Sequence, residues 1–294
     1  MGKASRRQRR SGGANARPTP VPFIARPFAG LRTETQWVAL REILPAATAT
    51  VRLRAEYAAA APAGLTYRIA TVLPMAWPGL HRADGTVYAA TQSGNSSGDP
   101  SRDLAAQLLA AAALDPGQPL VHAPTVNAGS PRLQDVLEDA PLDVEVHEGF
   151  DFWVEGQDLD ATAQESLTRA NEAAVPTTAL TALPSAYHVI IGDRAFVRLV
   201  LADDEDCATD ALARLSAAGS ASLGDGTRLL GAFRACGLLV PVWEVDITAE
   251  PAAGEPSLIA FGERYAAALA QPDPLNPAER RARAGLLSRQ VTLR

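Results

Sequence analysis

Runs of alternating apolar and polar residues predict several β-strands, most of them in hairpins. The clearest pattern lies at 188–201, where Gly192-Asp193 separates two alternating runs and has the residue types of a two-residue hairpin turn. A second alternating run covers 65–73. The turn signal Asp84-Gly85 then precedes a returning strand at 87–91. These patterns indicate antiparallel pairing.

Apolar residues at helical spacing predict helices between the strands. One helix begins near Thr33, and another follows Asp99-Pro100, which has the residue types of an N-cap and a first helical position. The apolar spacing in 227–236 predicts a further helix, with Gly237 as its C-terminal cap. Other helices are expected at 158–173, 203–215 and 256–269, and from 277 onward.

The order of these elements predicts an α+β fold of antiparallel hairpins packed with helices, because strand and helix do not alternate regularly. Helix–strand segments recur at 37–53 and 229–245, and hairpin–helix segments recur at 65–113 and 188–217, which allows two similar halves. The expected parts are a disordered basic tail at 1–27, an α+β globular region at 28–272 with a sub-boundary near 174–185, and an Arg-rich C-terminal helix or tail at 273–294.

Charge separates the N-terminal tail from the rest of the chain. Residues 1–32 contain eight basic residues and no acidic one, whereas the whole chain has a net charge of −6. The tail is rich in Gly, Ser, Asn and Pro, so it cannot bury apolar area and is expected to be disordered. Such a tail suits tethering to an anionic partner such as nucleic acid or the ribosome, and it equally suits a solvated extension that maintains solubility. The expected tethering residues are Lys3, Arg6, Arg7, Arg9 and Arg10.

Lysine and cysteine usage excludes several classes of protein. Lys3 is the only lysine, so the globular region has none for a phosphate-binding P-loop, a protein kinase or a Schiff base. No apolar stretch of a secretory signal follows the N-terminus, so a disulfide between Cys207 and Cys236 is not expected. The longest apolar run, 104–114, is too short to span a membrane. We therefore expect a cytoplasmic protein without a membrane span.

One short motif suggests a hydrolase. Residues 94–98, GNSSG, match the G-x-S-x-G pattern in which a sharp strand-to-helix turn exposes a nucleophilic serine, here Ser96. A triad would also need a carboxylate and a histidine from His122, His147 or His188. Asp99 and Pro100 separate Ser96 from the predicted helix, so a plain loop explains the same residues.

The acidic and histidine residues do not form a recognisable metal site. The run at 203–206 is typical of a helix N-terminus, with a hard-metal site as the alternative. Asp143, Glu145, His147 and Asp151 fit the solvated face of a strand within 142–154, which either bends or turns at Gly149, and a metal site is again the alternative. The four histidines lack zinc spacing, and Gly224-Asp225-Gly226 lacks the remaining glycines of a dinucleotide site. The sequence predicts no metal and no cofactor.

Three segments have a distinctive sequence: GKASRRQRR at the start, TQWVALREILPAATA at 35–49 and GLLVPVWEV at 237–245. Together they resemble an actinobacterial family that is known as a domain of unknown function. Its members are sometimes labelled preprotein translocase SecA or topoisomerase II. The chain is too short for either machine and lacks a phosphate-binding lysine. The resemblance brings no catalytic residue, and it implies a high-GC bacterial origin.

Two functions are compatible with these patterns. The first is a non-enzymatic intracellular interaction protein whose basic N-terminal arm tethers it to a nucleic acid or the ribosome, with a protein partner as well. The alternative is a hydrolase that uses Ser96 in the loop at 94–98.

Overall fold

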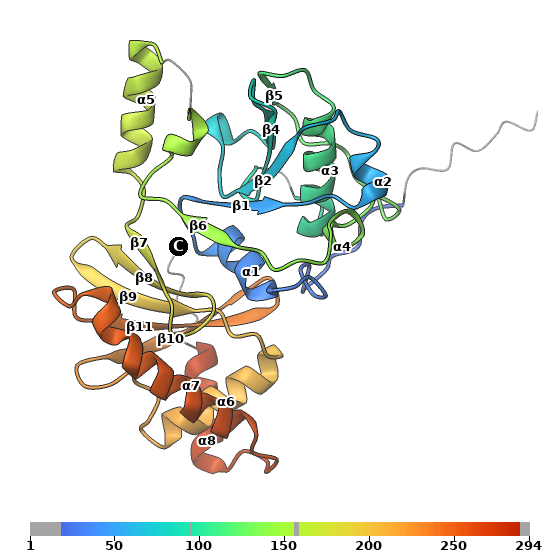
Figure 1. Ribbon diagram of the computed structural model, residues 1–294. Coiled ribbons are helices and arrows are strands. Elements are labelled where there is room, and N and C mark those ends of the chain that lie inside the picture. Colours follow the sequence, from blue (N-terminus) through green and yellow to red (C-terminus); the bar gives the residue numbers. More distant parts are fainter. Residues whose placement is uncertain (1–18, 95, 156–158, 289–294) are drawn as a thin grey trace, which may run out of the picture.

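Helix α1 (Glu34–Glu42) lies between two β-sheets, one formed by each half of the chain (Figure 1). The computed structural model describes residues 19–94, 96–155 and 159–288. These residues form the α+β fold that the sequence predicted. The last strand of the first sheet ends at Val146, and the first strand of the second sheet begins at Thr177.

The first sheet has the strand order β5-β3-β4-β2-β1-β6. Neighbouring strands are antiparallel except β2 and β4, which are parallel. Asp84-Gly85 closes a hairpin between β3 and β4. The strand at 87–91 was predicted to pair antiparallel with the strand at 65–73, and this prediction is wrong, because β4 pairs parallel with β2. The short β3 was hidden because three residues give no readable alternation. The strands are β1 (Ala47–Val51), β2 (Thr66–Ala70), β3 (Gly79–His81), β4 (Thr86–Ala90), β5 (Gln118–Leu120) and β6 (Val144–Val146).

The second sheet is antiparallel throughout, in the order β10-β11-β9-β8-β7. The hairpin predicted at 188–201 is confirmed as β8 and β9, with Gly192 at a φ of 62° in the turn. The helix predicted at 227–236 is wrong, because this segment is strand β10. Cys236 and Gly237 form the β10–β11 turn, both with positive φ, as a two-residue hairpin requires. The strands are β7 (Thr177–Leu180), β8 (Ala186–Ile191), β9 (Arg194–Leu199), β10 (Arg228–Ala235) and β11 (Leu238–Val245).

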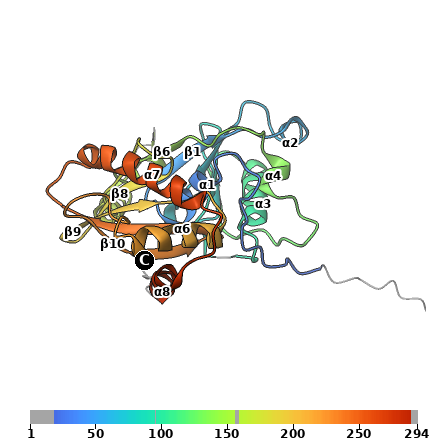
Figure 2. The same ribbon diagram turned by 90° about the horizontal axis from the view of Figure 1, so that it is seen from below.

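Helices cover the outer face of the second sheet. Three of them, α6, α7 and α8, lie on the face of the second sheet that points away from α1, with α6 between the other two (Figure 2). Asp99 and Asp204 cap α3 and α6 with their side chains, as the sequence predicted. The remaining helices are α2 (Ala55–Ala58), α3 (Pro100–Ala112), α4 (Leu133–Val136), α5 (Ala161–Glu172), α6 (Glu205–Ala217), α7 (Glu255–Leu269) and α8 (Pro277–Ser288), with 3₁₀ turns η1 (Pro74–Ala76), η2 (Asp151–Trp153) and η3 (Pro251–Gly254). Residues 142–154 therefore contain short β6 and η2 rather than one bent strand or a hairpin.

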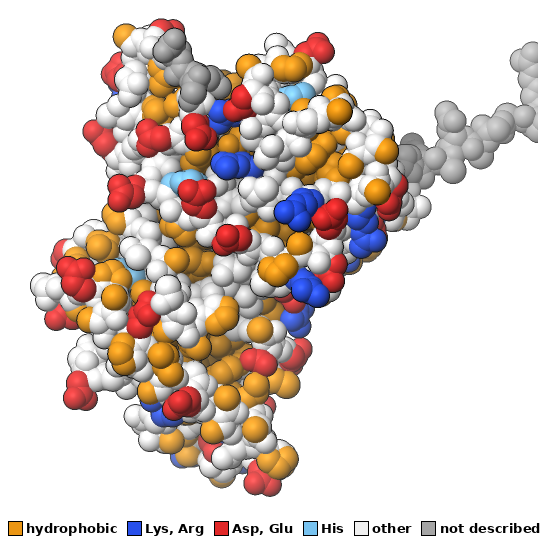
Figure 3. Space-filling model, in the orientation of Figure 1, with side chains coloured by type: hydrophobic (Ala, Val, Ile, Leu, Met, Phe, Trp, Pro, Cys, Tyr) orange, Lys and Arg blue, Asp and Glu red, His pale blue; other side chains and the backbone are white. Residues whose placement is uncertain are grey.

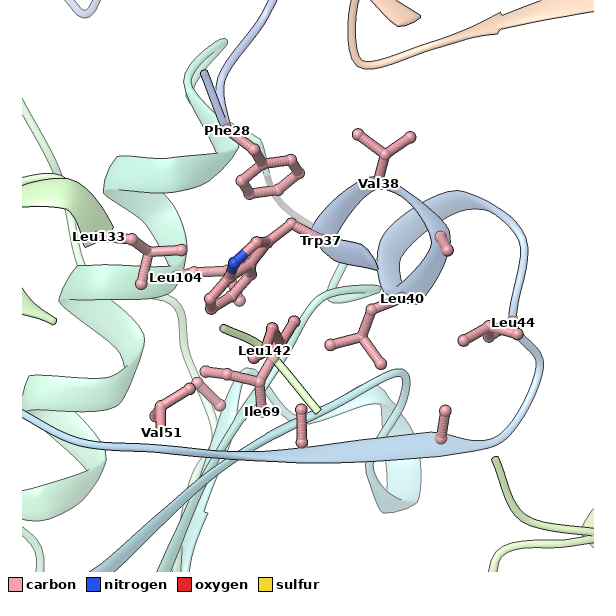
Figure 4. Packing of buried hydrophobic residues seen from close by; sticks show 14 of the residues in the cluster. Phe28, Trp37, Val38, Leu40, Leu44, Val51, Ile69, Leu104, Leu133 and Leu142 are labelled. Carbon is pink, nitrogen blue, oxygen red and sulfur yellow. The ribbon is translucent and has the colours of Figure 1, made fainter. Parts of the chain in front are cut away.

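A single buried cluster connects the two halves. It contains Trp37 and Leu40 of α1, Ile69 of the first sheet, and Val189 and Val240 of the second. Figure 4 shows the Trp37 ring surrounded by Phe28, Leu104 and Leu133. Because α1 contributes apolar side chains toward both sheets, the two halves share one core.

Polar contacts also hold α1 to the second sheet. The Ser185 hydroxyl donates to the Thr35 hydroxyl at 2.7 Å, and the Tyr187 hydroxyl donates to Gln36 Oε1 at 2.7 Å. The sequence suggested two pairs of similar segments in the two halves, and one of these pairs differs in structure. Segment 37–53 is a helix followed by a strand, whereas 229–245 is a hairpin.

Residues 19–27, called here the docked arm, lie against the body. The Ile24 N–H donates to the Gly98 carbonyl at 2.9 Å, and the Pro27 carbonyl accepts from Arg132 and Gln134. A Cβ on Gly237 would lie 2.7 Å from the Ala25 carbonyl oxygen, so only glycine allows the arm this close to the second sheet. The sequence predicted disorder over 1–27. For 19–27 the prediction is wrong, because hydrogen bonds to Gly98, Arg132 and Gln134, far along the chain, hold this segment in place.

Candidate anion-binding surface

A groove of about 410 Å³ lies where the docked arm joins the fold. Its walls are the turn before α1, the end of β1 and the segment after α4, and Trp37, Val51, Leu137 and Leu142 supply apolar lining. Three of its lining residues are arginines, so it is called here the arginine groove: Arg32, Arg52 and Arg54. Figure 3 shows arginine side chains, in blue, over the ends of β1 and α4.

The local sequence explains why two of these arginines lie together. Val51, Arg52, Leu53 and Arg54 alternate, and the two apolar side chains are buried in the shared core. Residues two apart on an extended chain point to the same side, so Arg52 and Arg54 both point outward. Beyond the end of β1 the extended chain continues with a bridge between Leu53 and Leu137, which places the segment after α4 opposite the arginines.

The three guanidinium groups differ in their availability to a ligand. Arg54 donates to the carbonyls of Leu137 and Gln134 at 2.9 and 2.8 Å, so it holds the wall of the groove. Arg32 lies 3.3 Å from Asp139 in an ion pair whose partners are both more than half exposed. The Arg52 carbonyl accepts from the Glu138 N–H at 2.9 Å, whereas its guanidinium group has no hydrogen-bond or ion-pair partner among the described residues. A planar guanidinium binds phosphate or carboxylate oxygens in pairs, and Arg52 is free to do so.

The docked arm lies between the arginine groove and the basic N-terminal residues in the chain. Gln134 lines the groove and donates to the Pro27 and Ala29 carbonyls, which fixes the inner end of the arm. The Ala128 N–H donates to the Thr19 carbonyl and fixes the outer end. The predicted tethering residues Lys3, Arg6, Arg7, Arg9 and Arg10 lie outside the described residues.

A second ion pair locks the arm near α1. Both Arg26 side-chain nitrogens Nε and Nη2 donate to the Glu34 carboxylate, at 2.7 and 2.8 Å, and Nη2 also donates to the Ala202 carbonyl. The hydrogen bond to Glu34 raises the pKa of the Arg26 guanidinium, so this guanidinium is charged at neutral pH. The arm thereby contacts both halves of the fold.

The hydrolase motif does not gather a triad in the described residues. Ser96 is exposed and lies in the loop between β4 and α3, four residues before α3 begins, and its Oγ accepts a 3.4 Å hydrogen bond from the Gly98 N–H. None of the histidines hydrogen-bonds to it. His81 contacts the Leu114 carbonyl, and His147 contacts the Thr48 hydroxyl. Among the described residues, Ser96 therefore lacks the histidine partner that a nucleophilic serine of this motif uses.

The acidic run at 203–206 is occupied by protein partners. Asp204 caps α6, and Asp203 accepts a hydrogen bond from the Tyr265 hydroxyl at 2.8 Å. Glu205 pairs with Arg234, and Asp206 pairs with Arg283. Within the described ranges no group of three or more His, Cys, Asp or Glu side chains could hold a metal ion.

Two histidines, the buried His188 and the partly buried His147, predict that stability decreases in mild acid. Burial lowers the pKa of His147 and of His188 below the ordinary value of 6.5. The unfolded chain therefore takes up these protons first, so the free energy of unfolding decreases as the pH falls below 6.5 toward the folded-state pKa values. Urea unfolding between about pH 7.5 and 5 should show this decrease, and the double variant His147→Gln/His188→Gln should show a smaller one. His122→Gln, at an exposed position, is the control; a double variant that keeps the wild-type slope contradicts the prediction.

The fold and surface define an α+β protein with a positively charged groove next to its N-terminal arm. A family model covers residues 27–294, and the chain belongs to that family, described as a family of unknown function (DUF5926). No curated protein and no solved structure matches the chain. In the part of the chain that the structure describes, no helix is both long and apolar enough to cross a membrane.

Proposed function

We propose that the protein is a non-enzymatic interaction protein that binds an anionic polymer, a nucleic acid or the RNA of the ribosome, through its basic N-terminus and the arginine groove. The observation that carries the proposal is the docked arm, which is fixed by Thr19 at one end and Pro27 at the other. The arm therefore fixes the point on the fold to which residues 1–18, with their six basic side chains, are joined.

The charges suit weak binding without sequence readout. Residues 1–18 contain no acidic side chain, and Arg32 and Arg52 extend the positive charge onto the folded surface. Contacts of this kind go to phosphates, release counterions and carry little base specificity. Glu138 and Asp139 at the far wall of the groove limit its net charge, so the basic N-terminus supplies most of the affinity.

Fluorescence anisotropy with a labelled single-stranded RNA tests the proposal on the full chain. If all six basic residues of 1–18 contact phosphates, the slope of log K against log salt is about −4. A variant with these six residues replaced by glutamine keeps the arm and the chain length, and it should lose most of the slope. The replaced residues are Lys3, Arg6, Arg7, Arg9, Arg10 and Arg17.

Two single variants distinguish RNA binding in the arginine groove from a general effect of positive charge on the surface. Arg52→Gln should weaken binding and reduce the slope by about 0.7, the value for one phosphate contact with a single strand. Arg169→Gln removes another exposed arginine, on α5 at a different edge of the molecule (Figure 1), and should change neither. Wild-type and tail-variant proteins with the same affinity and the same salt dependence would refute the proposal.

A further inference from the structure

A second cavity, of about 260 Å³, lies between the second sheet and the start of α7. It is on the opposite side of this sheet from α1, and none of its lining residues belongs to the arginine groove. Apolar side chains from three strands, one loop and one helix form its inner surface: Leu180, Val197, Leu223, Val245 and Leu258. It is called here the His188 cavity.

His188 is the polar group inside this lining. The side chain is on β8, opposite Val197 of β9, and the residue is 5% exposed. Its Nε2 atom is buried and has no hydrogen-bond partner. Leaving a buried nitrogen unpaired costs about 1–3 kcal/mol, so such groups in folded proteins normally have a partner. Burial also lowers the pKa of His188, so the imidazole is neutral at pH 7.

The mouth of the cavity is acidic. Asp225, Asp246 and Glu250 are exposed residues of the lining, and none of the described lining residues is Lys or Arg. The Thr248 N–H and hydroxyl both donate to Asp246, which fixes that carboxylate. A negatively charged ligand would meet three carboxylates and no cation. The charged groups of the lining accept hydrogen bonds and donate none.

The loop 223–227 at the edge of the cavity is held in a fixed conformation by its own hydrogen bonds. The Thr227 hydroxyl accepts from the Leu223 N–H at 2.8 Å and donates to the Gly224 carbonyl at 2.8 Å. Gly224 and Gly226 have φ values of 122° and 75°, which glycine adopts without strain. These contacts fix 223–227 as a closed turn, so the cavity has a defined wall.

We propose that the His188 cavity binds a small uncharged aromatic molecule of two-ring size that carries one N–H donor. The size follows from volume, because an apolar cavity of about 150 Å³ holds one benzene ring. The aromatic character follows from the aliphatic lining. The donor follows from the unpartnered Nε2, which accepts a hydrogen bond in the Nδ1–H tautomer, and from the acceptors at the mouth.

Isothermal titration calorimetry of the full chain with three probes tests this site. Indole has two rings and one N–H, naphthalene has two rings and no donor, and indole-3-acetate adds a negative charge. Indole should bind about tenfold more tightly than naphthalene, which is the effect of one hydrogen bond to an otherwise unpaired buried group. Indole-3-acetate should bind at least about tenfold more weakly than indole because of the carboxylates at the mouth.

Variants then assign the binding to this cavity. His188→Leu should remove the preference for indole over naphthalene, and His122→Gln should preserve it. Ser257→Trp places a large ring at the mouth without altering a buried side chain, so it should abolish binding of both probes in a protein that still unfolds cooperatively. Absence of indole binding to the wild type, an unchanged preference in His188→Leu, or unchanged binding in Ser257→Trp overturns the proposal. These variants leave the arginine groove intact, so this outcome is independent of the RNA experiment.

Discussion

Replacing Asp99 by alanine is expected to lower the free energy of unfolding by about 3 kcal/mol. Asp99 is fully buried, and its Oδ2 lies 3.1 Å from both Arg102 Nε and Arg132 Nε. Its Oδ1 accepts from the Ser101 N–H and caps α3. Removal of this carboxylate leaves two largely buried guanidinium groups without their counter-charge. Urea unfolding followed by tryptophan fluorescence measures the change.

The same variant should loosen the docked arm, because Arg132 also donates to the Pro27 carbonyl. Limited proteolysis near 19–27 should therefore be faster in Asp99→Ala than in the wild type. Asp99→Asn retains the cap and should lose less stability. The control Glu165→Ala breaks an exposed pair on α5 and should cost less than about 0.5 kcal/mol. A loss in Asp99→Ala no larger than in this control would contradict the buried network.

Trp243→Ala is expected to lower the free energy of unfolding by about 3–5 kcal/mol. The Trp243 side chain is completely buried between the second sheet and its helices, with its ring centroid 4.8 Å from that of Phe261 in an edge-to-face contact. Its Nε1 donates to the Ala221 carbonyl at 2.7 Å. Alanine leaves a cavity and an unpaired buried carbonyl. Thermal and urea unfolding measure the loss.

Trp243→Phe separates these two contributions. Phenylalanine fills most of the volume but cannot donate to Ala221, so about 1–3 kcal/mol should be lost. Ile259→Ala on α7 changes a side chain that is half exposed, and its effect should be within about 1 kcal/mol. If the exposed variant were as destabilising as Trp243→Ala, the second sheet and α7 would not pack as described.

Local patterns predicted those elements whose cause is local. The hairpin at 188–201 was found because alternation and Gly192-Asp193 agree. The caps at Asp99 and Asp204 were found because a side chain binds an N–H two or three residues ahead. In these cases all of the interacting residues are neighbours in the sequence, so the element can be predicted from the sequence alone.

Strand β10 was mistaken for a helix because both of its faces are apolar. Phe233 and Ala235 contact the core around α1, whereas Leu229 and Ala232 contact the core under α7. The register also shifts between Leu229 and Gly231, which disrupts the two-residue period. A strand buried on both faces has no polar alternation, and its apolar spacing then fits a helix as well.

The two candidate sites could be predicted from the sequence only in part. The alternation of Arg52 and Arg54 with buried residues was available in the sequence as a sign of two arginines on one side of a strand. His188 and Gly224-Asp225-Gly226 were each noticed, but nothing local indicates that they line one cavity with α7. Their proximity arises from strand pairing and helix packing across many residues, which no window of sequence contains.

The central position of α1 has a consequence for synthesis on the ribosome. This helix is translated first among the helices, yet the Ser185 hydroxyl that binds Thr35 follows 150 residues later, and Val240 arrives later still. Until then the apolar side of α1 that faces the second sheet has no native cover, while the other side already packs on the first sheet. The nascent chain thus carries an exposed hydrophobic strip for most of its translation, and such exposed apolar surface favours aggregation before folding is complete.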